Sequence, residues 1–138
     1  MKKALIIFTT LFTALSAATL LSCTTIKEIP EDKTSAQIIQ MGQNAVSSGD
    51  YKSALLCYQT VIDRFGEDPA IYVEAKYELA HVYSKQKKYE PAYAIYTELL
   101  EMYDEYGIAL PASYKKLCQI GLSKIPEGSV TTNSSAKE

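Results

Sequence analysis

The sequence predicts an all-α fold, and three observations lead to this prediction. First, the chain repeats itself with a period of 38 residues: "GDYKSALLCYQTVI", which starts at Gly49, aligns with "KKYEPAYAIYTELL", which starts at Lys87. A fixed period of this length is typical of helical-repeat proteins. Second, residues that begin and end helices follow one another at regular intervals along the chain. Third, few segments alternate between polar and apolar residues as strands do.

The first two helices are expected between residues 34 and 65. Thr34 and Gln37 have the spacing of a capping box, so the first helix begins there and runs to about residue 48. Gly49 ends this helix, and Asp50 can cap the start of the second. The second helix ends near Phe65.

Three further helices complete the predicted domain, which spans residues 34–125. Asp68 followed by proline begins the third, which runs to about Lys85. The fourth has a proline in its first turn and ends by Gly107, and the fifth begins at Pro111 and ends before Pro126. We therefore expect about five antiparallel helices in the order A, B, A, B, A, that is, two repeats and one further A-type helix as a cap.

The repeated positions indicate which side chains bring the helices together. Each A helix carries a large residue followed by a small one, as in Met41-Gly42, and each B helix carries an alanine between tyrosines. Small residues let antiparallel helices approach closely, and tyrosines fill the space around them. The repeat positions that we expect in the core are Gly42, Tyr51, Ala54, Tyr58, Ala80, Tyr89, Ala92, Tyr96 and Cys118.

This pattern resembles the tetratricopeptide repeat, which has a large and a small residue on helix A and Gly-x-Tyr-x-x-Ala-x-x-x-Tyr/Phe on helix B. The period here is longer than the usual one of about 34 residues, and Lys87 replaces the glycine that precedes the tyrosine. The longer period, with "FGEDP" after the second helix, is similar to bacterial envelope lipoproteins of the outer-membrane assembly and periplasmic coordinator type. The resemblance implies a short helical solenoid that binds partner segments on its concave face.

Residues 1–22 have the form of an export signal, because two lysines precede an uncharged stretch of mostly apolar residues. Two cleavage sites remain open. Ser16-Ala17-Ala18 suits ordinary signal peptidase, which would release the chain. Leu20-Leu21-Ser22-Cys23 resembles the lipobox of bacterial lipoproteins, which implies that an acylated Cys23 becomes the new N-terminus. We predict the second outcome, since two or three acyl chains anchor a protein stably.

The lipoprotein resemblance also predicts an address and a domain layout. Residues 23–33 would be the lipidated cysteine and a tether, and residues 126–138 a disordered tail. Thr24 follows the cysteine in place of the aspartate that marks retention in the inner membrane. The resemblance therefore implies a lipid anchor in the outer membrane, with the domain facing the periplasm.

Composition and motifs exclude several classes of function. The formal net charge of −2 argues against a nucleic-acid partner, which would require a basic face, and the composition does not favour anionic lipid head groups. No phosphate-binding loop, nucleophile elbow or paired-cysteine metal motif is present. His81 and Glu78 share a helix face, but no further metal ligand has helical spacing with His81. We expect no catalytic residues, cofactor or metal, and we expect Cys57 and Cys118 to be packing thiols.

The A helices supply the candidate binding surface. If their register is as predicted, the groove residues are Ile39, Gln43, Glu74, Tyr77, Glu78, His81, Lys115, Lys116 and Gln119. The fifth helix also carries Leu117, Ile120 and Leu122, spread around it, and Ile125 follows; this helix could leave an apolar edge for an envelope protein or a second copy of this chain. We predict a scaffold for envelope proteins, in outer-membrane protein assembly or in piloting a secretin. The alternatives are a small-ligand-binding lipoprotein that serves an uptake system and, ranked lowest, an envelope enzyme.

Overall fold

The computed structural model describes residues 25–131, and this part of the chain is all-helical, with no strands. The predicted all-α class and the five predicted helices are confirmed. The export signal, Cys23 and the end of the predicted tail lie outside the described residues. The helices are α2 (Ser35–Ser47), α3 (Tyr51–Phe65), α4 (Pro69–Lys85), α5 (Tyr89–Tyr106), the short 3₁₀-helix η1 (Gly107–Ala109) and α6 (Ala112–Ser123).

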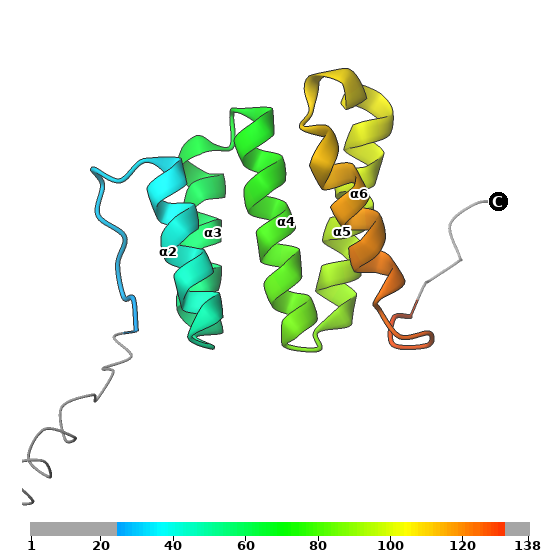
Figure 1. The fold of residues 1–138 in the computed structure, drawn as a ribbon, viewed down its shortest axis with the longest axis horizontal. Coiled ribbons are helices and arrows are strands. Elements are labelled where there is room, and N and C mark those ends of the chain that lie inside the picture. Colours follow the sequence, from blue (N-terminus) through cyan, green and yellow to red (C-terminus); the bar gives the residue numbers. More distant parts are fainter. Residues whose placement is uncertain (1–24, 132–138) are drawn as a thin grey trace, which may run out of the picture.

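The helices run up and down side by side, and each packs against the next (Figure 1). Helices α2, α4 and α6 form one layer, in which α4 contacts both α2 and α6. Helices α3 and α5 lie behind this layer (Figure 1). Among residues 25–131, no helix is both long and apolar enough to cross a membrane.

Side chains cap three of the helices at the residues that the sequence predicts. At α2 the capping box is complete, because the Gln37 amide donates to Thr34 Oγ1 at 3.3 Å and the Thr34 amide donates to Gln37 Oε1 at 3.0 Å. Asp50 caps α3 by accepting from the Ser53 amide at 3.1 Å. Asp68 caps α4 by accepting from the Ala70 amide at 2.9 Å. These bonds satisfy amides that would otherwise lack a partner in the first helical turn.

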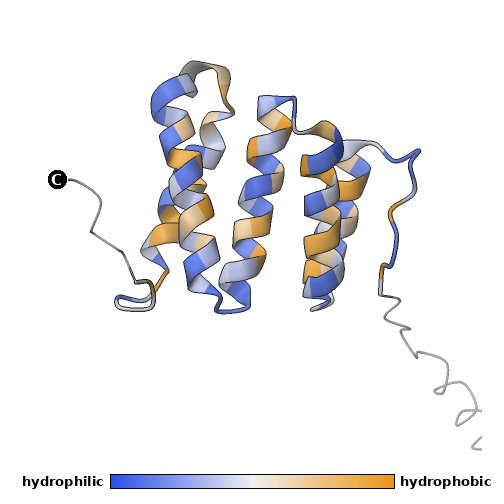
Figure 2. Cartoon of the chain, turned by 180° about the vertical axis from the view of Figure 1, so that it is seen from behind, coloured by the Kyte–Doolittle hydropathy of each residue, from blue (hydrophilic) through white to orange (hydrophobic). Residues whose placement is uncertain are grey.

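Two apolar clusters hold the layers together. The first joins α2, α3 and the inner side of α4 around Tyr58, and the second joins α4, α5 and α6 around Tyr96. Apolar and polar bands alternate along each helix, as expected when one stripe of a helix faces the interior (Figure 2). Most of the predicted repeat positions are buried, and Tyr51 and Tyr89, at the starts of their helices, are half-buried. The buried ones are Gly42, Ala54, Tyr58, Ala80, Ala92, Tyr96 and Cys118.

The packed part of the chain begins earlier than the predicted boundary at residue 34. Ile29 is buried in the first cluster, and the Ile26 amide donates to Ser53 Oγ at 2.8 Å. Arg64 of α3 donates to the carbonyl oxygens of Ile29 and Pro30, each at 3.0 Å. We expected a free tether up to residue 33, whereas residues 26–31 are held against α3 by these contacts.

The chain after α6 also differs from the prediction. Ile125 packs against the second cluster, and Thr131 Oγ1 donates to Glu90 Oε1 of α5 at 3.0 Å. We expected a disordered tail from residue 126, but residues 126–131 turn back toward the start of α5. A turn at Pro126, in which the Ser129 amide donates to the Pro126 carbonyl at 3.2 Å, changes the direction of the chain there.

Candidate functional site

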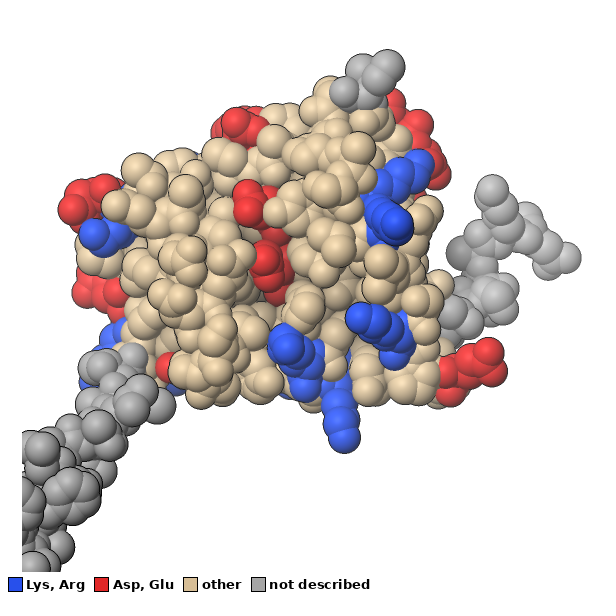
Figure 3. Space-filling view, in the orientation of Figure 1, with Lys and Arg blue, Asp and Glu red and all other residues tan. Residues whose placement is uncertain are grey.

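A groove of about 340 Å³ lies between α4, the first half of α5 and α6. It opens on the α2–α4–α6 side of the molecule, the face shown in Figure 3. Its wall combines tyrosine rings, aliphatic side chains and cationic groups. The lining residues are Tyr77, His81, Ser84, Lys85, Tyr89, Tyr96, Leu117, Ile120, Gly121, Lys124 and Ile125. We call this set the α4–α6 groove.

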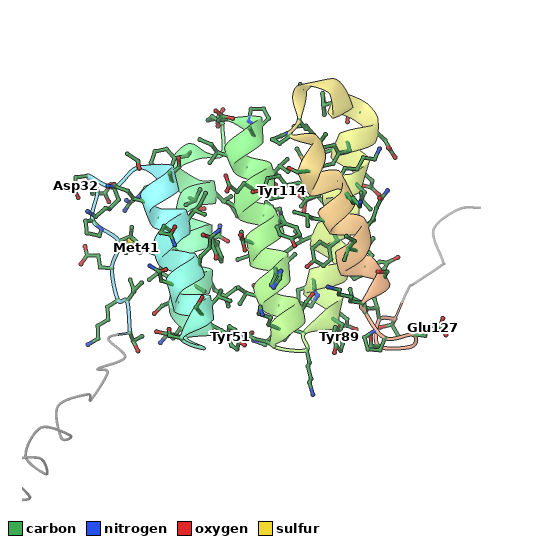
Figure 4. The ribbon with its side chains drawn as sticks, in the orientation of Figure 1. Asp32, Met41, Tyr51, Tyr89, Tyr114 and Glu127 are labelled. Atoms are coloured by element: carbon green, nitrogen blue, oxygen red, sulfur yellow. The ribbon has the colours of Figure 1, made fainter. Side chains whose placement is uncertain are left out.

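Aromatic rings meet at the upper end of the groove around Tyr77. The centre of its ring lies 5.4 Å from that of Tyr114 and 6.0 Å from that of Tyr96. Tyr114 extends from α6 toward α4 (Figure 4). His81, one helical turn after Tyr77, has its ring centre 6.0 Å away in an edge-on arrangement, and Tyr77 Oη lies 3.4 Å from His81 Nδ1. Burial raises the pKa of Tyr77 to about 12, so its hydroxyl stays protonated.

Two carboxylates of α4 lie beside this aromatic cluster. Gln43 of α2 donates from Nε2 to Glu78 Oε1 at 3.0 Å, which ties α2 to α4. Burial, together with the negative charge of Glu74, raises the pKa of Tyr114. Acidic side chains accordingly occupy the centre of this face (Figure 3). Because Glu74 and Glu78 are only half-buried, they are accessible for an ion pair with a cationic group of a partner.

The opposite end of the groove is basic. Burial lowers the pKa of His81, the positive charges of Lys85 and Lys124 lower it further, and the charge of Glu78 acts in the other direction. His81 is therefore mostly neutral at neutral pH, while the two lysines carry the positive charge. Along α4 the character of the face thus changes from acidic at Glu74 to basic at Lys85.

The structure brings together five of the nine predicted groove residues, and it corrects one. Gln43, Glu74, Tyr77, Glu78 and His81 gather on the α2–α4 side of the face, as the sequence predicts. Ile39 was wrongly placed in the groove, because its side chain is 6% exposed and packs in the first apolar cluster. The helical register of α2 turns both Ile38 and Ile39 inward, where apolar burial is favourable.

The three predicted residues of α6 lie outside the lining of the α4–α6 groove. Lys115 Nζ is 3.1 Å from Asp104 of α5, so this lysine turns toward the far end of α5. Lys116 and Gln119 are exposed. The groove is instead closed on this side by the neighbouring residues of α6, chiefly Leu117 and Ile120. Ile120, a large apolar residue, is 38% exposed, and the sequence predicts it as part of a possible apolar edge and not as a groove residue.

The chemistry of this arrangement favours binding. Glu78 accepts a hydrogen bond from Gln43, and His81 lies against Tyr77, so these two residues, which share a helix face, have different neighbours. Within residues 25–131, no three histidine, cysteine or carboxylate side chains are placed to hold a metal ion. Burial raises the pKa of Cys57 and of Cys118 to about 11, which keeps both thiols protonated.

Comparison with known proteins finds a relative that covers most of this chain. The chain is similar to an uncharacterized protein of Treponema pallidum (strain Nichols), with 36% identity over 100 residues. The match covers 72% of this chain and 40% of the relative, so the chain spans less than half of the relative's length. No protein-family model matches the chain, and no solved structure matches it.

Proposed function

We propose that this chain is a lipid-anchored scaffold of the tetratricopeptide-repeat type, which docks a segment of another cell-envelope protein on its α2–α4–α6 face. The repeat pattern supports the solenoid assignment, since residues 38 apart in the sequence, such as Tyr58 and Tyr96, occupy equivalent buried places in the two clusters. The resemblance of residues 20–23 to a lipobox supports the anchor on Cys23 and the outer-membrane address.

The observation that carries the docking proposal is the composition of the α4–α6 groove. Leu117 and Ile120 offer apolar contact, and the tyrosines offer rigid surface that loses little entropy when a partner binds. Charged groups of opposite sign flank this apolar part, with Glu74 and Glu78 on one side and Lys85 and Lys124 on the other. A docked segment would therefore place a basic group near the glutamates and an acidic group near the lysines.

In-cell photo-crosslinking of the full-length chain tests this proposal. A photoreactive residue at Ile120 should capture a specific envelope protein, identified by mass spectrometry, and Lys124→Glu should weaken the capture. Leu56 of α3 is the matched control, because it is a large apolar residue with nearly the same exposure, 36% against 38%. Equal products from both positions, or only abundant bystanders, would argue against docking in the groove.

A small-ligand function is the second candidate, and the size of the groove favours it. Its volume of about 340 Å³ is within the range of small-molecule sites, and polar groups of Tyr77, His81 and Ser84 converge on it. A metabolite that binds there should raise the Tm of the wild type and should lose this effect in Tyr77→Phe or His81→Gln. If a protein partner stabilises the chain and no metabolite does, the scaffold function is supported.

A further inference from the structure

The two ends of the helical domain differ in charge: one end is basic and the other is acidic. Helix α2 ends, α3 and α5 begin, and α4 and α6 end on the same side (Figure 1). Five exposed lysines lie in or beside these termini, against three acidic residues, Asp50, Glu90 and Glu127. We call this side the lysine end, after Lys52, Lys85, Lys87, Lys88 and Lys124.

The opposite end is acidic. The turn between α3 and α4 carries Glu67 and Asp68, and the last turns of α5 carry Asp104 and Glu105. The nearby cations are partly neutralised, because Arg64 pairs with Glu31 at 2.8 Å and Lys115 pairs with Asp104 at 3.1 Å. Figure 3 shows basic side chains at the middle of the lower edge and acidic ones along the upper edge, together with a further basic group at the upper right and an acidic group at the lower right. The net charge of −2 conceals this separation.

The chain enters the fold at the lysine end. Ile26 donates to Ser53 in the first turn of α3, and the following residues run along α3 until Arg64 holds the carbonyl oxygens of Ile29 and Pro30. Cys23 precedes Ile26 by three residues, which even a fully extended chain spans in at most about 11 Å. An acyl group on Cys23 would therefore be tethered within this reach of the lysine end.

We propose that the lysine end faces a bilayer surface that contains anionic phospholipids. This inference rests on the proposed acylation of Cys23, and two independent observations support it: the point where the chain enters the fold and the position of the lysines. Each lysine close to an anionic bilayer raises the association constant by a factor of roughly five. This effect fades within a Debye length of about 10 Å. The α2–α4–α6 face then stands upright on the membrane, with the basic end of the groove nearest to the lipid.

Energy transfer from a fluorophore to head-group acceptors measures this orientation. The acylated full-length protein is reconstituted into vesicles of phosphatidylethanolamine and phosphatidylglycerol, with the fluorophore on Ser48→Cys at the lysine end or on Ser113→Cys at the acidic end. Both serines are exposed, whereas Cys57 and Cys118 are buried and do not compete for the label. Because the two ends are separated by roughly 20–25 Å, the length of α2 or α4, we expect several-fold stronger transfer at Ser48→Cys.

Two charge variants test the contribution of the lysines. Lys87→Gln/Lys88→Gln/Lys124→Gln removes three charges from the lysine end, and Lys33→Gln/Lys115→Gln/Lys116→Gln removes three from elsewhere. The first variant should lower transfer at Ser48→Cys, as should high salt or vesicles of phosphatidylcholine alone, and the second should leave it unchanged. Equal transfer at the two labels, greater transfer at Ser113→Cys, or equal losses in both variants would overturn the proposal.

The intact mass of the purified protein separates this test from the test of the anchor. If the mass shows no acyl group on Cys23, the proposed anchor fails. Both labelled proteins are then prepared again with Cys23→Ser, so that the fluorophore attaches only at the chosen position, and are mixed with phosphatidylglycerol vesicles. Transfer at Ser48→Cys that exceeds transfer at Ser113→Cys still supports a lipid-facing lysine end, and no transfer at either label overturns it.

Discussion

Gly42 of α2 lies directly against the ring of Tyr58 of α3, so that a Cβ at position 42 would stand 2.5 Å from Cε1 of the tyrosine. The same relationship occurs between α6 and α5, where a Cβ at Gly121 would stand 2.5 Å from Cζ of Tyr96. Both tyrosines are almost fully buried, and they are 38 residues apart. Each repeat therefore uses a tyrosine on its B helix to fill the space that a glycine on a neighbouring helix leaves open.

Replacing Gly42 by alanine should destabilise the fold by about 1–3 kcal/mol, since the buried Tyr58 ring has little room to move away. Chemical denaturation measures the change. Gly107→Ala is the control, because no atom lies within 4 Å of a Cβ at that position and its φ of −46° suits any residue. A Gly42→Ala protein as stable as the wild type would show that α2 and α3 can separate without cost.

Removing the hydroxyl of Tyr58 should leave stability unchanged or raise it. This hydroxyl is buried and has no hydrogen-bond partner among the described residues, so Tyr58→Phe removes a polar group that is costly to bury. Tyr103→Phe is the matched control: Tyr103 is also buried, but its hydroxyl donates to the Pro111 carbonyl at 2.6 Å. The control should lose about 1 kcal/mol in the free energy of unfolding. Equal losses of stability in Tyr58→Phe and Tyr103→Phe would contradict the prediction that only the Tyr103 hydroxyl stabilises the fold.

Lys87→Gly should stabilise the protein by about 0.5–1 kcal/mol. Lys87 has a φ of 59°, a left-handed conformation that is unfavourable for a residue with a side chain. The equivalent position in the first repeat is Gly49, with a φ of 78°. The gain is partly offset by the greater freedom of glycine in the unfolded chain. Lys88→Gly is the control, since Lys88 has a φ of −86°, and it should bring no gain in Tm.

Arg64→Lys should release the segment that precedes α2. The guanidinium of Arg64 donates to Ile29, Pro30 and Glu31 together, a geometry that a lysine ammonium cannot reproduce. Hydrogen exchange at Ile26 should then become faster, with a loss of about 1–2 kcal/mol in global stability. Glu31→Gln should have little effect, because the Glu31 side chain is 90% exposed. Unchanged exchange at Ile26 would show that the apolar contact of Ile29 alone holds the segment.

Stability should fall as the pH falls through the range in which His81 titrates. Its folded-state pKa is lowered from 6.5, chiefly by burial, so below about pH 6.5 the unfolded chain binds this proton more readily than the folded one. His81→Gln should remove this part of the pH dependence, while other groups titrate alike in both proteins. Denaturation at neutral and mildly acidic pH measures the difference. If the two proteins lose the same stability, His81 titrates normally in the fold.

The sequence determines the helices of this protein because the signals that begin them are local. Thr34, Asp50 and Asp68 cap helices through residues only two or three positions away, so reading the chain is enough to place them. The 38-residue period likewise predicts the buried tyrosines, since residues on the inner stripe of a helix recur with the helical turn. The central part of the candidate site, from Glu74 to His81 on one face of α4, follows from the same spacing.

Only the tertiary structure decided which distant residues meet. Ile26 binds Ser53 across 27 positions of sequence, and Arg64 reaches Ile29 across 35, contacts that no local pattern indicates. The register of α2 turned Ile39 inward, and the close approach of α6 to Tyr96 formed the groove beside Ile120. The gathering of lysines at one end of the molecule is also a result of the tertiary structure. It depends on the antiparallel order of five helices, which brings termini far apart in the sequence to one side of the molecule.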